Sequence, residues 1–597
     1  MYLKKLTVSN FRKLKFTAFE FTQGLNIIVG ANNIGKTALV DGLRSLLAGH
    51  EDPYPRFTSD DIHRPADGSI PRGDILFQFE FTGLSIEDEA DFLPALMPVG
   101  DSFDAHISVS YSSVDSSSGR MKPRRWCGAH DEISLNSDML ENLRGVYLQP
   151  LRDASQGLKP GRNSQLARLL RLLGQNDDAG QKDIEKALSD FDNKLKVTTP
   201  IKSTQNAIVN RHEAMLGEQL SQLLTVGISS TDFKRLSARL SLQADAFEID
   251  QNGLGFNNLI FMAVVLSEMV KDPTAAYRGL IVEEPEAHLH PQLQSVLLDY
   301  LQGIHAEETD GDVQVFVTSH SPNFASIANL DSTICLVESN NLVDAFFPRD
   351  IKFDSDGKKH LKIRQKLERY LDVTRAELFF ARRVIFVEGA AELMLISVLS
   401  NRIGAKYNLR RHAISLISVE GLNFDSFLPL FGHKSLPIPV SAITDADPFK
   451  EVVLAGKKQS IPVYPDLGEK TNISANTLSM TEREDSLVKV FYGVKTFEYD
   501  LALHEDNRTV MLSALSELHP KIAADLKVKV GNAVSNKDKA KTLFCGMFER
   551  GEGKTNVQKG RYGQVLAQSI VEHSGNFVVP DYITNAVKHV CDYKGIV

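Results

Sequence analysis

Cysteine and tryptophan are scarce in this sequence. Its 597 residues include 4 cysteines and 1 tryptophan. The cysteines are scattered and show no paired ligand spacing. Neither a disulfide framework nor a cysteine-based zinc site is therefore expected, and this usage suits a reducing cytoplasm. The four are Cys127, Cys335, Cys545 and Cys591.

The sequence also lacks an excess of positive charge and a long apolar run. It contains 67 Lys and Arg against 76 Asp and Glu, a net charge of −9. A nucleic acid would therefore be held by local patches and metal ions rather than by a global basic surface. No apolar run approaches the roughly 18 residues of a membrane helix. The chain starts with a strand-like segment, residues 2–8, instead of a signal peptide. We expect a cytoplasmic protein without membrane contacts.

What is present begins with two apolar strands, predicted over residues 384–387 and 438–443, that are each followed by two acids. The ends of parallel strands lie side by side, so four carboxylates are expected at one sheet edge. Such a cluster needs cations, and hard oxygen ligands favour Mg²⁺ or Mn²⁺. The alternative is an ordinary strand followed by a solvated acidic turn. It would explain the acids after one strand, but it explains acids after both strands less well. The pattern resembles a TOPRIM domain, with the acids Glu388, Glu392, Asp445 and Asp447.

A phosphate-binding loop stands near the N-terminus. A strand over residues 25–29 is followed by Gly-Ala-Asn-Asn-Ile-Gly-Lys-Thr and by a helix predicted through Leu47, which is the strand–loop–helix context that this motif requires. Loop N–H groups cradle the phosphates of ATP, Lys36 reaches the β and γ oxygens, and Thr37 holds the metal ion. The loop positions are Gly30, Asn32, Asn33 and Gly35.

A second part of this site is expected much later in the chain. The strand predicted over residues 279–282 ends in Glu283 and Glu284, and it resembles the Walker B segment of the ABC/SMC clan. The resemblance implies that Glu283 supports the metal ion and that Glu284 orients or deprotonates the attacking water. After the strand 313–317, His320 resembles the switch histidine that senses the γ-phosphate. Such a histidine is often only a packed residue, but the order of the motifs favours sensing.

Three shorter segments resemble the same clan. The Asn-Phe-Arg at residues 10–12 matches the opening of SMC- and recombination-mediator-like ATPases, and residues 147–153 stand where a Q-loop is expected. Gln149 is therefore a predicted sensor of the γ-phosphate and metal. Residues 251–258 occupy the place of the signature motif but lack its serine, although Asn252 and Gly253 offer polar and backbone groups. We expect ATP binding, while hydrolysis stays open.

An ABC-type ATPase fused to a TOPRIM domain resembles the overcoming-lysogenization-defect (OLD) family of nucleases, which includes Gabija-type and retron-associated phage-defence effectors. Residues 494–501 resemble the Thr-Leu-Glu strand of that family, which implies that Glu498 is a further metal ligand with Thr496 nearby. Residues 559–563 open a helix and resemble its Lys-Gly-x-Phe-Ala segment. Lys559 is then the predicted catalytic lysine, acting as a base or as a transition-state cation; the alternative is a solvated surface lysine.

The length exceeds the roughly 250–300 residues at which a single core stops growing, so several domains are expected. The predicted fold class is α/β: an ABC-type ATPase lobe with a helical insert, followed by a Rossmann-like TOPRIM domain. The insert is either the ATPase's helical subdomain or a dimerisation arm. Shorter predicted elements are strands over residues 74–81 and 105–111, a loop over 112–119, a helix over 207–224 and an irregular loop over 463–485. The expected segments are residues 1–155 and 236–345 (ATPase), 156–235 (insert), 346–380 (helical linker) and 381–597 (TOPRIM with C-terminal helices).

The resemblance implies an ATP-regulated DNA endonuclease of anti-phage defence that works by a two-metal mechanism, as a homodimer or higher homo-oligomer. A topoisomerase would need a cleavage-domain tyrosine and a primase a zinc domain, and neither pattern is present. The remaining alternatives are a DNA-binding or repair scaffold and a sensor subunit acting through a helicase or a retron reverse transcriptase–RNA complex. Among short basic clusters, Lys554 with Lys559 and Arg561 is the one that accompanies the predicted site.

Overall fold

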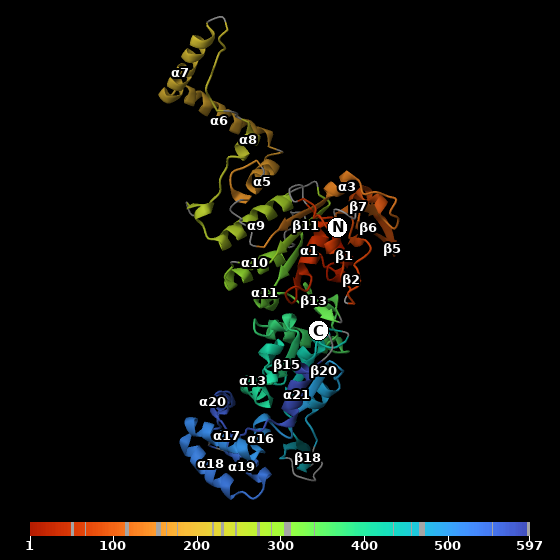
Figure 1. Ribbon diagram of the computed structural model, residues 1–597, viewed down its shortest axis with the longest axis vertical. Helices are drawn as coiled ribbons and strands as arrows, with labels where there is room; N and C mark the ends of the chain where they lie inside the picture. The colour runs from red at the N-terminus through yellow and green to blue at the C-terminus, as the bar shows by residue number, and fades with distance from the viewer. Residues whose placement is uncertain are drawn as a thin grey trace.

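The computed structural model shows an elongated molecule of two lobes with a projecting helical insert (Figure 1). It describes residues 1–593 except 49–52, 66, 114–118, 151–156, 163, 176, 218–219, 229–231, 245–246, 272–274, 288, 304–311, 340, 434, 455–456, 465–471, 552 and 554. The Q-loop segment beyond Pro150, most of the predicted loop over residues 112–119, and Lys554 therefore lie outside the described residues.

The N-terminal lobe begins with an antiparallel sheet of order β2-β1-β4-β6-β5, with β7 paired to β6. The strands predicted over residues 74–81 and 105–111 are confirmed as neighbours in it. The bounds are β1 Tyr2–Phe11, β2 Leu14–Glu20, β4 Ile75–Thr82, β5 Leu96–Val99, β6 Ser102–Ser113 and β7 Met121–Cys127.

The second sheet of this lobe has the order β14-β13-β3-β12-β11-β8, and only the edge strand β14 runs antiparallel. The phosphate-binding loop, the Q-loop segment, the Walker B acids and His320 each follow one of its parallel strands, so these four motifs share one edge. The helix α1 (Lys36–Arg44) ends three residues before the predicted Leu47. The strands are β3 Leu25–Val29, β8 Leu143–Leu148, β11 Tyr277–Glu283, β12 Gln314–Ser319, β13 Thr333–Ser339 and β14 Leu342–Phe346.

The insert consists of helices, and α6 and α7 project furthest from the lobe (Figure 1). The helix predicted over residues 207–224 starts earlier and ends at Leu216, where Gly217 takes a φ of 75°. The helices of the insert are α5 Gln165–Gly174, α6 Asp178–Lys196, α7 Thr199–Leu216 and α8 Phe233–Ser237. The helix α9 (Leu254–Lys271) follows the insert.

The helix α9 corrects one expectation. By length and hydropathy α9 is long and apolar enough to cross a membrane, so the statement that no run approaches that length is wrong. Half of the helix is buried in the structure, and its residues Phe261, Val265 and Met269 belong to the core cluster of the ATPase sheet. Packing of this kind is typical of a core helix.

The C-terminal lobe is built on a parallel sheet of order β16-β15-β17-β20. Its strands are β15 Arg383–Val387, β16 Ile414–Ser418, β17 Val440–Thr444 and β20 Val488–Tyr492. The helices that cover it or extend from it are α13 Ala390–Ile403, α14 Phe424–Phe427, α16 Phe497–Ala502, α17 Glu505–Leu518, α18 Pro520–Asn532, α19 Asn536–Phe548, α20 Lys559–Glu572 and α21 Asp581–Cys591.

Two predictions for this lobe differ from the structure. The stretch 463–485, expected as an irregular loop, contains the helix α15 (Ala475–Thr481) and follows a hairpin of β18 (Phe449–Leu454) and β19 (Lys457–Pro462). The strand predicted over residues 494–501 is a turn followed by α16. Asp500 accepts bonds from the backbone N–H groups of Val494 and Lys495 at 2.9 and 3.2 Å, and these local bonds favour the turn over a strand.

The lobes are joined by α12 (Gly357–Tyr370), the predicted helical linker, and by the short 3₁₀ helix η6 (Ala376–Phe380). One buried hydrophobic cluster contains residues of both sheets and of the connection, including Val317, Leu378 and Phe386. Because the cluster is continuous, the connection packs as part of the core.

Candidate nucleotide and metal sites

The loop between β3 and α1 packs closely against β13. Gly30 takes a φ of 153°, and a Cβ at this position would lie 2.9 Å from the carbonyl oxygen of Leu336. Lys36 is buried, and its Nζ donates to the carbonyl oxygens of Gly30 and Ala31 at 2.5 and 2.9 Å. Burial lowers the pKa of Lys36 to about 8, although Glu284 and Glu286 act in the opposite direction. An anionic phosphate would restore the stability of the charged form.

Glu283 connects three elements. Its Oε1 accepts a bond from the hydroxyl of Thr37 at 2.8 Å, and its Oε2 accepts one from the hydroxyl of Tyr147 at 2.7 Å. Thr37 and Glu283, which were each predicted to serve the metal ion of the nucleotide, contact each other directly in the structure. Tyr147 begins the Q-loop segment, and its role as a partner of Glu283 was missed because it depends on the pairing of β8 with β11.

A second carboxylate network surrounds the predicted sensor. His320 Nε2 lies 2.9 Å from Glu284 Oε1. Glu286 Oε1 accepts bonds from the Ser319 hydroxyl and the His320 backbone N–H, both at 2.8 Å. Burial and the nearby Lys36 ammonium lower the pKa of His320, while Glu284 opposes them. Glu286, which the sequence analysis did not single out, therefore fixes the loop that carries His320.

Three buried polar atoms of this region have no hydrogen-bond partner: Glu286 Oε2, Thr318 Oγ1 and His320 Nδ1. Buried polar atoms are normally paired, so such a set indicates a missing ligand or water. Together with the Lys36 ammonium and the Thr37–Glu283 pair, they fit a nucleotide phosphate with its cation.

Gln149, Asn252 and Gly253, the remaining residues predicted to contact the nucleotide, are connected less directly to the phosphate-binding loop. Gln149 is exposed and follows β8 at the same sheet edge. Asn252 Nδ2 donates to Asn257 Oδ1 at 3.1 Å and its own Oδ1 accepts from the Gly253 N–H at 3.0 Å. Within the described part of the chain no hydrogen bond connects Asn252 or Gly253 to the phosphate-binding loop. Their roles, like that of Gln149, stay predictions.

The Asn-Phe-Arg opening has a structural role. Arg12 lies between two carboxylates, with Nη1 at 2.7 Å from Asp41 and Nε at 2.9 Å from Asp61. The Asn10 side-chain amide donates to the carbonyl oxygens of Arg72 and Asp74. These bonds tie the end of β1 to α1 and to the segment that leads into β4.

In the C-terminal lobe, Glu388 stands at the end of β15 and reaches across to β17. Its Oε1 accepts a bond from the Thr444 hydroxyl at 2.6 Å and one from the Asp445 N–H at 2.8 Å. Burial raises the pKa of Glu388, and Asp447 adds to this effect. Thr444 was not predicted as part of the site, although it directly precedes Asp445.

Two further acids lie beside it. Burial and the nearby Glu498 raise the pKa of Glu392 to about 7. Burial, Glu388 and Glu498 raise the pKa of Asp445 well above its ordinary value, and its Oδ1 accepts a bond from the Phe497 N–H at 2.9 Å. Carboxylates that shift each other in this way lie close together in a poorly solvated space.

Glu498 and Lys559 complete the cluster. Glu498 is 2% exposed, and its Oε2 lies 2.8 Å from the Lys559 ammonium. Burial would lower the pKa of Lys559, but Glu498, Asp445 and Glu392 outweigh it and raise that pKa. Asp447, by contrast, is exposed and takes a φ of 41°, so it borders the cluster at its solvent side.

The carboxylate and hydroxyl oxygens of this cluster are ligands of the kind that divalent cations bind. Among the described residues no three His, Cys, Asp or Glu side chains are already arranged around a single metal position. Glu388 is turned toward Thr444, and Glu498 toward Lys559. However, Glu498 Oε1 and Thr496 Oγ1 are buried without a hydrogen-bond partner. Free oxygens among carboxylates of raised pKa are what a hard cation would use.

The family models and the curated relatives agree with this architecture. A family model described as overcoming lysogenization defect protein-like TOPRIM domain matches residues 379–447, and those described as AAA ATPase domain and AAA domain match residues 134–325 and 5–225. The OLD nuclease of Thermus scotoductus (strain ATCC 700910 / SA-01) is 26% identical over 425 residues, which cover 67% of this chain and 74% of that protein.

The endonuclease GajA of Bacillus cereus (strain VD045) is 20% identical over 543 residues, covering 87% of this chain and 86% of the relative. The solved C-terminal region of the Burkholderia pseudomallei OLD protein is 24% identical, covers 36% of this chain and 98% of that one, and superposes with a TM-score of 0.24. The chain is thus an AAA-type ATPase joined to an OLD-like TOPRIM domain. It is homologous to OLD nuclease and to the GajA endonuclease, as the motifs predicted.

Proposed function

We propose that this chain is an ATP-regulated, divalent-metal-dependent DNA endonuclease that acts as a cytoplasmic anti-phage effector in prokaryotes. The names of its homologues support the reaction class. The observation that carries the proposal is the cluster of Glu388, Glu392, Asp445 and Glu498 with Lys559 at one sheet edge.

The chemistry divides between the cations and the chain. Mg²⁺ or Mn²⁺ held at this edge supplies charge neutralisation and an activated water for phosphodiester hydrolysis. Glu388, Glu392, Asp445, Asp447 and Glu498 are the proposed ligands. The Lys559 ammonium, now paired with Glu498, is placed to turn toward the scissile phosphate and stabilise its developing charge. Because the pKa values of Glu388, Glu392 and Asp445 are raised, these three acids would bind cations with release of protons.

ATP is proposed to regulate cleavage. Lys36 and the loop N–H groups would hold the phosphates, and Thr37 with Glu283 the accompanying cation. Glu284 and His320, which contact each other, are placed to orient a water and to sense the γ-phosphate.

For DNA contacts we propose the helical region of residues 519–562. It contains ten Lys and Arg against four Asp and Glu, in a chain whose net charge is −9. The helix α20 starts at Lys559 and packs against α13, which carries Glu392. The region therefore places positive charge next to the acid cluster, which an anionic duplex could not approach otherwise.

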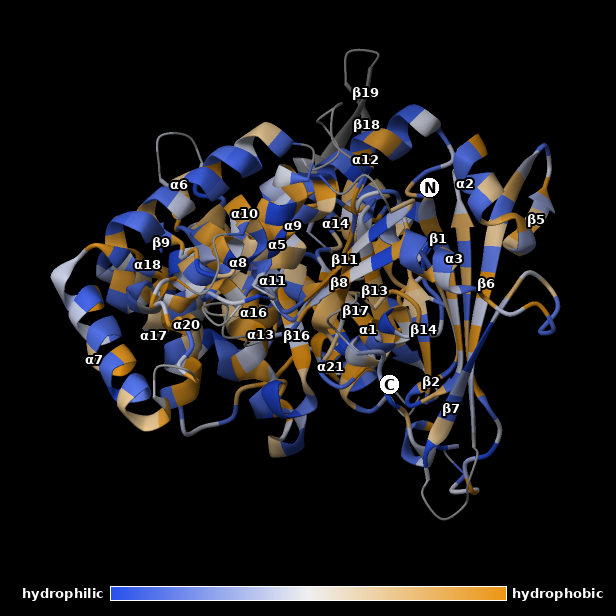
Figure 2. Cartoon of the chain, turned by 90° about the horizontal axis from the view of Figure 1, so that it is seen from above, coloured by the Kyte–Doolittle hydropathy of each residue, from blue (hydrophilic) through white to orange (hydrophobic). Residues whose placement is uncertain are grey.

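We further propose that the insert mediates association of copies of this chain. Exposed apolar side chains gather on it, and α7 mixes hydrophobic and polar residues along its length (Figure 2). Exposed apolar groups of this kind mark interfaces, and a monomer mass in light scattering would contradict the idea. The exposed apolar side chains of the insert are Phe191, Val197, Ile208, Met215, Leu216, Leu220 and Leu223. A helicase or a retron reverse transcriptase–RNA partner stays a prediction from the family resemblance.

The test is cleavage of supercoiled plasmid with Mg²⁺, Mn²⁺ or EDTA, with and without ATP. EDTA should abolish cleavage. Glu388→Gln should lower the rate by about 100-fold or more, because even residues that only orient a metal ligand contribute roughly 10–100-fold. Asp131→Asn, an exposed acid of the N-terminal lobe paired with Arg124 of β7, is the matched control and should cleave normally. No cleavage under any metal would favour the DNA-binding scaffold instead. Normal cleavage by Glu388→Gln would show that the acid cluster is not the catalytic site.

A further inference from the structure

A buried arginine ties the connection between the lobes to the C-terminal sheet. Arg375 directly precedes η6, and its side chain is 10% exposed. Its Nε donates to the carbonyl oxygen of Ser418 at 2.9 Å, and its Nη2 lies 2.7 Å from Glu420 Oε1. Both partners belong to the end of β16 and the turn that follows it. One guanidinium therefore holds this turn against the connecting segment.

The same turn holds the backbone of Glu388. The Gly421 N–H donates to the Glu388 carbonyl oxygen at 2.7 Å, and the Val419 N–H donates to that of Val387 at 2.9 Å. Between these two bonds, Glu420 takes a φ of 52°, a conformation that residues other than glycine avoid. The contact with Arg375 helps to keep Glu420 in that conformation, and with it the position of Glu388.

At its other side, η6 packs against the helix α11 (Pro322–Ile327). This helix begins two residues after His320, whose ring contacts Glu284 in the nucleotide site. Phe324 of α11 and Leu378 of η6 lie in one buried cluster. Because packed interiors transmit displacement, a shift of the His320 loop on nucleotide binding reaches η6.

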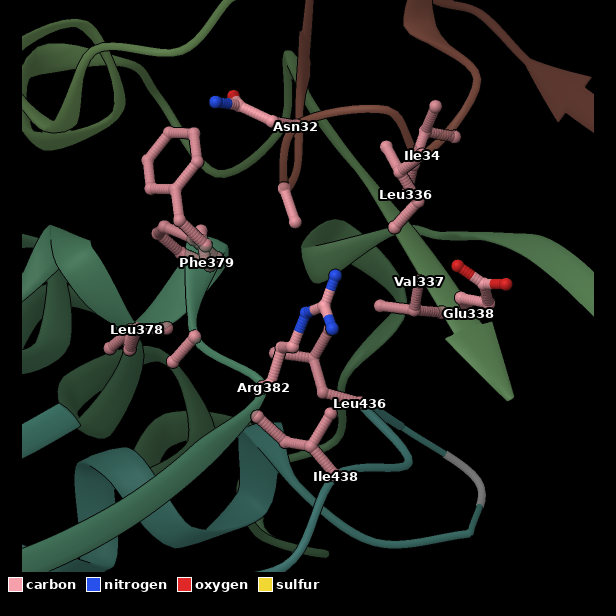
Figure 3. Close-up of a pocket in the computed structure, with 13 residues that line it drawn as sticks. Asn32, Ile34, Leu336, Val337, Glu338, Leu378, Phe379, Arg382, Leu436 and Ile438 are labelled. Carbon is pink, nitrogen blue, oxygen red and sulfur yellow. The ribbon is translucent and has the colours of Figure 1, made fainter. Parts of the chain in front are cut away.

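The phosphate-binding loop and the residues that follow η6 also face each other across a pocket. A pocket there is lined by Ala31, Asn32 and Ile34 on one side and by Phe379 and Arg382 on the other. The Arg382 side chain projects from the C-terminal lobe into this pocket, below the loop that carries Asn32 (Figure 3). Arg382 directly precedes β15, so the strand that ends at the acid cluster starts beside the nucleotide loop.

We propose that Arg375 is a positioning residue for Glu388, and that the segment from Arg375 to Arg382 transmits nucleotide occupancy to the metal-binding end of β15. The consequence for cleavage rests on the proposed function. The conformational coupling does not, because it needs only nucleotide binding. The two coupled sites are the phosphate-binding loop and the acid cluster. The contacts proposed to differ between the nucleotide-free and the nucleotide-bound state are those of the His320 loop and of Arg375.

The test separates this clamp from other contacts of the same segment. Glu420→Gln removes the charge that faces Arg375, and Glu420 is 66% exposed, so the variant is expected to fold. Asp425→Asn is the matched control. Asp425 pairs with Lys366 of α12 at 2.8 Å and is 41% exposed, but the pair does not touch the turn that holds Glu388.

The first measurement is hydrogen exchange over residues 384–392 and 415–424, with and without ATP. ATP should change the hydrogen exchange of both segments in the wild type and in Asp425→Asn. In Glu420→Gln, ATP should leave the hydrogen exchange of both segments unchanged. The same response in Glu420→Gln, or no response in the wild type, would overturn the inference.

The second measurement is the Mn²⁺ concentration that half-saturates plasmid cleavage. We expect ATP to shift it by about five-fold or more in the wild type and the control, the lower range of typical coupling between sites, and not in Glu420→Gln. If no protein cleaves but the exchange response follows the expected pattern, the proposed function fails and the coupling stands. If cleavage occurs and Glu420→Gln keeps the full ATP shift, the coupling fails alone.

Discussion

At the scale of residues, the acid cluster is defined by what opposes its negative charge. Burial and mutual repulsion favour the protonated carboxyl groups, as the pKa of about 7 for Glu392 illustrates. Lys559 is a cation that contacts the cluster directly, through Glu498. Because the lysine is held among acids and its own pKa is raised, it stays charged at neutral pH. A charged Lys559 favours the proposed role of an electrostatic stabiliser over that of a base.

We therefore predict that Lys559→Met lowers the cleavage rate by about 10²–10³-fold, the usual effect of removing one transition-state donor. The measurement is single-turnover plasmid cleavage at saturating metal, together with thermal unfolding to verify the fold. Lys588→Met, an exposed lysine of α21, serves as the control. Equal rates for both variants would show that Lys559 is only a surface lysine.

At the scale of elements, the nucleotide site depends on how closely the segment after α1 approaches β8. Gly145 of β8 pairs with Gly279 of β11, and a Cβ on Gly145 would lie 1.7 Å from the Leu47 carbonyl oxygen. No side chain can be accommodated there without moving the backbone. Two strands that carry nucleotide-site residues, Tyr147 and Glu283, would move with it.

Gly145→Ala is accordingly expected to destabilise the protein by about 1–3 kcal/mol, as overpacking usually does. Gly531→Ala provides the contrast, since Gly531 lies in α18 and a Cβ there meets nothing within 4 Å. That change should stabilise by about 0.4–1 kcal/mol. Melting temperatures of the two variants should move in opposite directions, and a normal melting temperature for Gly145→Ala would refute the close packing.

At the scale of the whole molecule, the lobes share one continuous core, while charge is distributed unevenly between them. The basic region of residues 519–562 lies on the far side of the C-terminal lobe from the nucleotide site (Figure 1). DNA and ATP would thus bind at opposite ends of the two-lobed body, with the acid cluster on the DNA side. A regulatory effect of ATP then requires coupling through the connecting segment.

Reversing charge in the basic region should weaken DNA binding. Lys527→Glu with Lys539→Glu, on α18 and α19, should lower the affinity for duplex DNA in EDTA. It should also reduce the slope of log K against log salt by about 0.9 for each lost phosphate contact. Lys358→Glu with Lys362→Glu on α12 is the matched control. If both pairs behave alike, DNA binds elsewhere.

By itself, the sequence determined the strands and loops whose patterns are local. The loop from Gly30 to Thr37 and the acids after β15 and β17 stand where apolar strands and turn residues indicated. The helix that starts at Lys559 stands where the family resemblance indicated. Only the tertiary structure decided which groups meet across distant segments. Tyr147 on Glu283, Thr444 on Glu388 and Arg375 on Glu420 depend on strand order and core packing. Residues 494–502 form a turn and a helix instead of the strand that the family resemblance implied, because Asp500 bonds its own backbone neighbours and such bonds cannot be read from a resemblance in sequence.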